Sequence, residues 1–348
     1  MKVYINAAAS ISPQKSFEGA LSNEDICQYT GKLTAIEPNY KDIIPPMKLR
    51  RMGRIVRMGL SAAMQTLQKA GTEKPGAIIT ATGWGCLEDT FKFLDEIDRN
   101  KEQTLSPALF IQSTHNTVGG QIAYHLECQE YNSVYVNHRN SFEQGLLDAR
   151  LLIEEGKENV LVGGLDELTE GFYQLTQQAE YWKQASVSTE DMFNNNEKGT
   201  LPGEGASFFI LSGKPTPDTV AELNYVGITA DISPELALHN LPEEYTEIDL
   251  VLNGMNGDPE EDKHYLTFAS KFFPTTSVYT YKQLCGEYDT ASAFALWLAC
   301  QILADQKVPD CLHSVIQIAY PHQIRNILIH HHTQPNEHAF ILVSKTGL

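Results

Sequence analysis

Apolar and polar residues follow one another along this chain in the alternating patterns of strands and helices. Short apolar runs such as Ala77 to Thr82 predict strands that are buried on both faces. Residues Leu49 to Ala70 instead place arginines and apolar residues at helical spacing, which predicts a long amphipathic helix. Gly83, Gly85 and Cys86 predict a turn from the strand into another helix. This order indicates an α/β protein.

The pattern of strands and helices begins again after residue 213. The segment Gly213 to Pro217 reads Gly-Lys-Pro-Thr-Pro, which predicts a break in regular structure. We therefore expect two similar α/β halves, residues 1–213 and 218–348, each large enough to bury a core. The segments expected to be strands or helices are 3–8, 49–70, 77–82, 117–126, 133–137, 141–155, 159–162 and 208–211, and then 221–229, 248–252, 262–272, 277–281, 290–303, 327–330 and 339–343.

The segment Ser141 to Glu155 carries both a start and a stop signal for a helix. Ser141 and Gln144 have the spacing of a capping box, and Gly156 supplies the stop. The next run, Asn159 to Val162, predicts a strand that is closed by two glycines.

Composition and charge exclude some classes of function. The 348 residues include 26 Lys and Arg against 44 Asp and Glu, a formal charge of −18. This balance argues against a nucleic-acid binder, which needs a basic face. Six cysteines without a CxxC pair indicate a reduced, intracellular protein. With no signal-peptide pattern and no window near the ~20 apolar residues that span a bilayer, we expect a cytoplasmic protein with no membrane role.

Two local features could carry chemistry. His330, His331, His332 and His338 form a cluster that either binds a metal or forms the polar end of a strand. Neighbouring residues on a strand face opposite sides, so the four rings cannot all converge, and we favour the polar strand end and expect no metal. Cys86 lies on a glycine-rich turn before a helix, where a thiol can be activated, but we interpret it as a packing residue.

We expect no cofactor. The chain contains neither GxGxxG nor GxxxxGK, the loops that cradle nucleotide phosphates. The aromatic residues Phe172, Tyr173, Tyr181 and Trp182 are interpreted as core or interface and not as a ligand site.

Several segments, in order, resemble the β-ketoacyl-acyl carrier protein synthase family of the thiolase fold. Gly203-Glu-Gly-Ala206 matches a GEGA element of that family, and Lys282 with Gly286 matches its Lys-x-x-x-Gly-His. Each match is short, but their order and spacing make the whole specific. The other segments that carry the resemblance are Arg50–Met52 with the following helix, Ala81–Thr90, Ser106–Ala123 and Asp258–Asp262.

The resemblance implies two similar α/β halves in a five-layer αβαβα arrangement and a decarboxylating condensation by a Cys thiolate with two His donors. The thiolate would stand between strand 133–137 and helix 141–155. Counting back from Gly156 places it at Arg139, and counting from Gly163 places it at His138. Neither residue is cysteine, and we expect Arg139 to fill or salt-link the vacated pocket.

The other catalytic positions implied by the resemblance also depart from the family. Asn253 stands at the first His position and can still donate a hydrogen bond. Glu287 stands at the second, where an ionised carboxylate would repel a malonyl group, and Lys282 can pair with it. The glycine-rich loop of the oxyanion hole aligns with Thr333 to His338, which contains Pro335 and no glycine.

These departures lead to our main hypothesis, a catalytically silent subunit that resembles a chain length factor. Such a subunit would pair with an active ketosynthase in type II fatty acid or polyketide biosynthesis, including aryl polyene systems, and would work on acyl carrier protein substrates. By resemblance, the segment near the dimer axis contains the residues that would close the partner's acyl tunnel: Leu109, Phe110, Ile111 and Gln112.

Two alternatives belong to other classes. One is a divergent condensing or acyl-transfer enzyme that uses His138, Asn253 or Cys86. The other is a homodimer that binds an acyl chain or a carrier protein without chemistry. A stable acyl adduct would favour the first, and a homodimer without adduct would favour the second.

Overall fold

The computed structural model describes residues 1–19, 21, 23–184, 186–229, 247–318, 323–334 and 337–347. Its strands are β1 (Tyr4–Ile11), β2 (Ala77–Ala81), β3 (Tyr131–Tyr135), β4 (Val160–Asp166), β5 (Gly205–Ser212), β6 (Ala221–Thr229), β7 (Leu250–Asn253), β8 (Ser277–Thr280), β9 (Ser314–Ile316), β10 (Asn326–Gln334) and β11 (Glu337–Ser344). Its α-helices are α1 (Pro46–Leu49), α2 (Arg54–Lys69), α3 (Leu87–Arg99), α4 (Pro107–Gln112), α5 (Thr117–Leu126), α6 (Ser141–Glu154), α7 (Glu170–Gln178), α9 (Pro259–Phe272), α10 (Lys282–Cys285) and α11 (Ala291–Asp305). Short 3-10 turns lie at η1 (Asn23–Asp25) and η2 (Tyr40–Asp42).

The strands of the described residues hydrogen-bond in the order β3-β2-β4-β5-β1-β6-β11-β10-β7-β8-β9. This order contains a repeat. In the first part β2 is parallel to β3 and β4, while β5 lies between β4 and β1 and is antiparallel to both. In the second part β7 is parallel to β8 and β10, while β10, β11 and β6 are antiparallel neighbours. The two parts meet where β1 pairs with β6, and the predicted boundary at residues 213–218 falls between β5 and β6.

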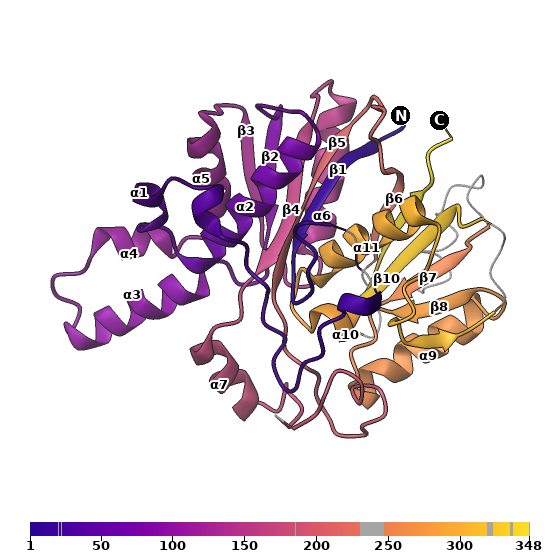
Figure 1. Cartoon of the computed structure of the whole chain (residues 1–348). Coiled ribbons are helices and arrows are strands. Elements are labelled where there is room, and N and C mark those ends of the chain that lie inside the picture. Colours follow the sequence, from indigo (N-terminus) through magenta and orange to yellow (C-terminus); the bar gives the residue numbers. More distant parts are fainter. Residues whose placement is uncertain are drawn as a thin grey trace.

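Helices cover and separate the two parts of the sheet (Figure 1). Helices α2 and α5 pack on the outer face of the first part, and α9 packs on the outer face of the second. Helices α6 and α11 lie between the parts, because α6 contacts β2, β4 and β6 and α11 contacts β4, β5, β10 and β11. The resulting layers run helix, sheet, helix, sheet, helix, so the expected α/β class and five-layer arrangement are confirmed.

The central helix α11 shows why its sequence suits this middle layer. Between Ala291 and Leu303 it is apolar on nearly every side, and Phe294 and Trp297 are completely buried. A helix that is apolar all round is stable in water only when other elements surround it. The principal core cluster runs through this helix and joins the two parts of the sheet.

Two expectations about local structure were wrong. The glycine pair does not close the strand after residue 159, since β4 continues through Gly163 and Gly164 to Asp166. A Cβ atom at Gly163 would come within 2.3 Å of the Phe208 ring, so glycine serves close packing there and not a turn. The capping box is also absent: Asn140 is the N-cap of α6, and the Ser141 hydroxyl donates to the His138 carbonyl.

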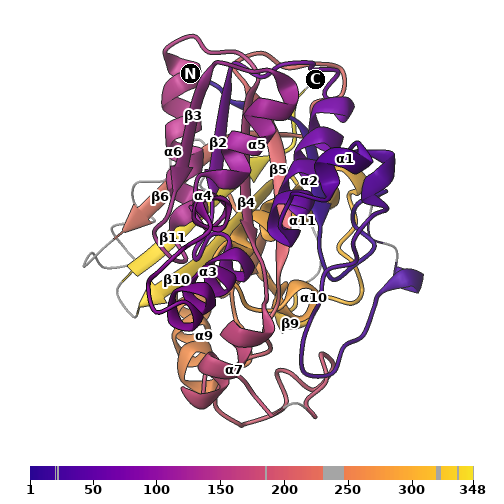
Figure 2. The ribbon, with the colours of Figure 1, turned by 90° about the vertical axis from the view of Figure 1, so that its left-hand side faces the viewer.

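Helices α3 and α4 project from the first part of the molecule and pack on each other (Figure 1). Figure 2 shows them on the same side as the edge strand β3. The sequence analysis marked the start of α3 but no helix at 170–178, where α7 forms. No helix in the described part of the chain is both long and apolar enough to cross a lipid bilayer.

Candidate functional site

A cavity of about 760 Å³ opens between the two parts of the molecule. Its walls come from the turn between β3 and α6, the end of β4, helix α7, the segment before and within the first turn of α9, and the segment after α10. These are loop segments at element ends, where functional residues commonly gather on a rigid scaffold. Of the residues predicted from sequence, His138, Arg139 and Glu287 line this cavity.

One wall is a buried ionic network centred on Arg139. The guanidinium donates to Glu261 at 3.0 Å, and its Nε lies 3.7 Å from Glu287. Glu287 also accepts a 2.6 Å hydrogen bond from Lys282, and both side chains are about 95% buried. The expected pairing of Lys282 with Glu287 is therefore present, and Arg139 is salt-linked.

The network decides the charge of Glu287. Burial alone would raise the pKa of this carboxyl group, but Lys282 and Arg139 outweigh burial and lower its pKa to about 2. The carboxylate is thus ionised throughout the neutral range and accepts hydrogen bonds without donating any.

The segment around Asn253 contributes a different residue from the one expected. Asn253 is buried at the end of β7, where its side-chain oxygen accepts from the Met255 backbone amide. Asn256, three residues later, reaches the network and donates to both Glu287 and Glu261. Sequence reasoning missed Asn256 and Glu261, although Glu261 lies inside the Asp258–Asp262 motif.

His138 lies at the mouth of the cavity and not in the network. Its side chain is 64% exposed, and Nδ1 is 4.0 Å from the Asp289 carboxylate. Its backbone is left-handed, with φ of 47°, an uncommon conformation for a residue that is not glycine. Positions 138 and 139 therefore share a turn but differ completely in burial.

A second wall of the cavity carries aromatic rings and acids. Trp84 packs against Phe172 and His138, with ring centroids 5.2 Å and 5.5 Å away. Burial is the first cause that raises the pKa of both Glu167 and Asp289 to about 7, with Glu88 adding to it at Glu167 and Asp166 at Asp289. The aromatic segment that we expected in core or interface contributes Phe172, Tyr181 and Trp182 to the cavity lining. Trp182 is buried, as expected, whereas Tyr181 is 59% exposed.

The four histidines are buried and divided between the two faces of the sheet. His330, His332 and His338 lie beside α9, and His330 Nε2 is 3.0 Å from His338 Nδ1. His331 faces the other way and contacts Glu143 of α6 at 2.8 Å. Burial lowers the pKa of His330 well below its usual value and that of His332 to about 3, so both rings are neutral at pH 7.

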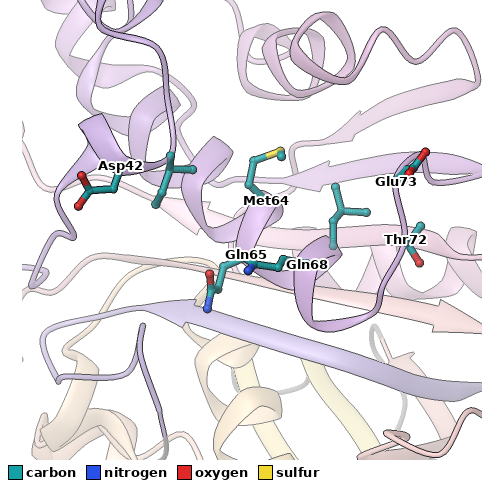
Figure 3. Close-up of a pocket in the computed structure, with 8 residues that line it drawn as sticks. Asp42, Met64, Gln65, Gln68, Thr72 and Glu73 are labelled. Carbon is teal, nitrogen blue, oxygen red and sulfur yellow. The ribbon is translucent and has the colours of Figure 1, made fainter.

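A second hollow lies beside α2 and η2, away from all of these residues (Figure 3). Its volume is about 360 Å³, and polar side chains including Asp42, Gln65, Gln68 and Glu73 line it. It contains no residue that the sequence analysis singled out.

Comparison with known proteins identifies the scaffold. Residues 28–194 match the family described as "Beta-ketoacyl synthase, N-terminal domain". No curated protein sequence matches the chain.

The fold of the whole chain is that of ketosynthases. The structure titled "The ishigamide ketosynthase/chain length factor" is similar with a TM-score of 0.80 and 19% identity, and 99% of each chain is covered. A β-ketoacyl synthase from Burkholderia phymatum has a TM-score of 0.79 at 15% identity, with 99% of each chain covered. The ketosynthase ApeO in complex with its chain length factor ApeC, from Xenorhabdus doucetiae, has a TM-score of 0.76 at 15% identity, covering 99% of this chain and 98% of that one.

The remaining candidate residues of this ketosynthase-like chain lie apart from the cavity. Leu109, Phe110, Ile111 and Gln112 form most of α4, where Phe110 is 57% and Ile111 is 63% exposed. The segment aligned with the oxyanion loop contributes to the β10–β11 hairpin, in which His332 pairs with His338, while Pro335 lies outside the described residues. Cys86 is fully buried, and burial raises its pKa to about 12.

Proposed function

We propose that this chain is a ketosynthase-like subunit without condensing chemistry, which pairs with an active ketosynthase as a chain length factor does. The observation that carries the proposal is the Arg139 network. A condensing enzyme of this fold needs a thiolate nucleophile at the start of the helix that corresponds to α6. Here an arginine, neutralised by Glu261 and Glu287, takes the place beside the cavity, and no described lining residue is a cysteine.

The charge of Glu287 supports the same proposal. Decarboxylation of a malonyl thioester needs hydrogen-bond donors around its carboxylate and its developing oxyanion. Glu287 stays ionised down to a pKa of about 2, so it donates nothing and repels an anion. A malonyl group would meet a carboxylate already paired with Lys282 and Arg139 where an active enzyme offers an imidazole donor.

The exposed apolar residues on one side of the molecule support a partner. Phe110 and Ile111 on α4 and Tyr131 and Val136 at the edge strand β3 are all more than a third exposed. Exposed apolar residues that gather on one side of a molecule commonly mark a protein interface. The similar structures include ketosynthases with chain length factors and, in one case, an acyl carrier protein bound to its ketosynthase.

Co-expression with an active ketosynthase of a type II system tests the pairing. We expect the two chains to co-purify as a 1:1 complex, and we expect the double change Phe110→Asp and Ile111→Asp to abolish it, because two charges would be buried at the contact. Leu266→Asp is the matched control, since Leu266 is 44% exposed but lies on α9 at the far side. A chain that forms only homodimers in native mass measurements contradicts the heterodimer.

Intact-mass analysis tests the lack of chemistry. The chain alone is incubated with acyl and malonyl thioesters of an acyl carrier protein, and its mass and the products are measured. We expect neither an acyl adduct nor a condensed product. An adduct that disappears in His138→Gln would instead establish the divergent enzyme.

A further inference from the structure

Acidic groups outnumber cations in the described lining of the cavity by seven to two. Both cations are already matched, Arg139 by Glu261 and Glu287 and Lys198 by Glu180. The carboxyl groups of Glu167 and Asp289 have no lysine or arginine within 4.0 Å among the described residues. Within the described part of the chain, the cavity therefore retains two acidic groups that form no ion pair with a lysine or arginine.

Glu167 is a deeply buried carboxyl group with an unsatisfied hydrogen-bond acceptor. It is only 4% exposed, and one of its oxygens accepts from the Glu88 backbone amide at 2.9 Å. Its other oxygen, Oε2, is buried and has no hydrogen-bond partner. A buried carboxyl oxygen without a partner costs free energy, and this residue belongs to the cavity lining.

Aromatic rings stand beside these acids. Trp84 is 45% exposed and packs on Phe172 at the cavity wall. Asp289 lies directly against the neighbouring residue, since a Cβ atom at Gly83 would come within 2.1 Å of its carboxylate. An indole face next to carboxylates is the arrangement that attracts organic cations.

We propose that this cavity binds a small organic cation, with an amine or quaternary ammonium group held between Trp84 and the carboxyl groups of Glu167 and Asp289. Anions are disfavoured by the same acids, and a neutral ligand would leave both carboxyl groups without a counter-charge. A volume of about 760 Å³ admits a ligand with an apolar body in addition to its charged group. The proposal does not depend on the ketosynthase partnership, because every group named belongs to this chain.

The affinity should rise with pH. Glu167 and Asp289 have pKa values of about 7, raised mainly by burial, so both gain charge between pH 6 and pH 8. The titratable and charged groups that face them are Arg54, Cys86, Glu88 and Asp89 around Glu167, and His138, Arg139, Asp166, Lys282 and Glu287 around Asp289.

Calorimetric titration of the full chain with tetramethylammonium chloride tests the proposal, with neopentyl alcohol as the uncharged isostere and sodium chloride as the salt control. We expect saturable binding of the cation at millimolar concentrations and binding of the alcohol at least about tenfold weaker. Trp84→Leu should weaken cation binding by about 2- to 30-fold. Glu167→Gln and Asp289→Asn should each weaken it by at least about threefold.

Controls separate the site from the general acidity of the chain. Tyr124→Leu and Glu154→Gln alter an exposed aromatic ring and an exposed acid that do not line the cavity, and both should bind as the unchanged chain does. A rise in affinity between pH 6 and pH 8 should persist in His138→Gln. Equal binding of the alcohol and the cation, or unchanged binding in Trp84→Leu and Glu167→Gln, would overturn the proposal, as would a pH dependence lost in His138→Gln. Thermal melts of every variant confirm folding.

Discussion

Glu287 and Asp289 stand two residues apart on one segment, line one cavity and are both largely buried, yet their pKa values move in opposite directions. Burial disfavours the charged form of each. At Glu287 the cations Lys282 and Arg139 outweigh burial and bring the pKa to about 2. At Asp289 burial is reinforced by Asp166, and the pKa rises to about 7.

The difference shows that the two walls of the cavity differ in how their charged groups are paired. The wall with Arg139 satisfies its own charges and offers an incoming group little. The wall with Trp84 carries Asp289 and Glu167, which form no ion pair with a lysine or arginine among the described residues. Burial raises the pKa of the carboxyl groups in both walls. The positions of Lys282 and Arg139 decide that only the Glu287 carboxylate is held in its ionised form by paired cations.

The largest effect should come from removing the carboxylate that completes the first wall. Glu287→Gln leaves Lys282 and Arg139 buried with one acid fewer, and breaking a buried ion pair by losing one partner costs about 3–5 kcal/mol. The free energy of unfolding, from urea denaturation at pH 7, should fall by that amount. Glu261→Gln is the control: its side chain is 35% exposed, so its loss should cost much less. Equal effects of the two changes would contradict the distinction.

A smaller effect should come from crowding the second wall. Gly83→Ala places a methyl group 2.1 Å from the Asp289 carboxylate, and overpacking of this kind costs about 1–3 kcal/mol. In the Asp289→Ala background the carboxylate is gone, so the same change should cost far less. A double-mutant cycle measured by urea denaturation checks this, and additive effects would show that the two residues do not touch.

Some of this arrangement could be predicted from sequence. The bounds of α5 and β6 follow from local pattern and agree with the structure to the residue. The pairing of Lys282 with Glu287 follows from a short spacing within one segment. Gly163 was misread because its small size serves contact with Phe208, a residue of another strand.

The second wall could not be predicted because, as at Gly163, its contacts join residues that are far apart in the sequence. Trp84 follows β2 and Glu167 follows β4, so the parallel pairing of these strands brings both to one edge of the sheet. Asp289 precedes α11 and joins them only through packing of the two parts of the molecule. A tryptophan in a glycine-rich turn and isolated acids carry no local signal of a shared cavity. Likewise Asn256 reaches Glu287 through the loop after β7, which no spacing rule describes.

The two acids should also respond differently to pH. A group whose pKa is raised on folding adds stability below its unfolded value, and this is lost as pH rises through the folded value. Asp289→Asn should therefore gain stability relative to the unchanged chain between about pH 4 and pH 7, by at most about 1.4 kcal/mol per pH unit. Glu287→Gln should show a much smaller change from pH 5 to pH 8, because Glu287 itself titrates near 2 and is only a lesser cause of the raised Asp289 pKa. Urea denaturation at pH 5, 6, 7 and 8 measures both differences, and parallel curves for the two variants would contradict the comparison.

The smallest effect concerns the turn that joins the walls. His138 has φ of 47°, a left-handed conformation that costs a residue with a side chain roughly 1–2 kcal/mol and glycine almost nothing. His138→Gly also loses the ring contact with Trp84, so we expect a net stabilisation between zero and about 1 kcal/mol. Asn140→Gly is the matched control, because its φ of −98° needs no glycine and the change should stabilise nothing. If His138→Gly is the more stable chain, a gain in stability does not explain why histidine occupies this strained and exposed position. A function at the mouth of the cavity then becomes the explanation to test.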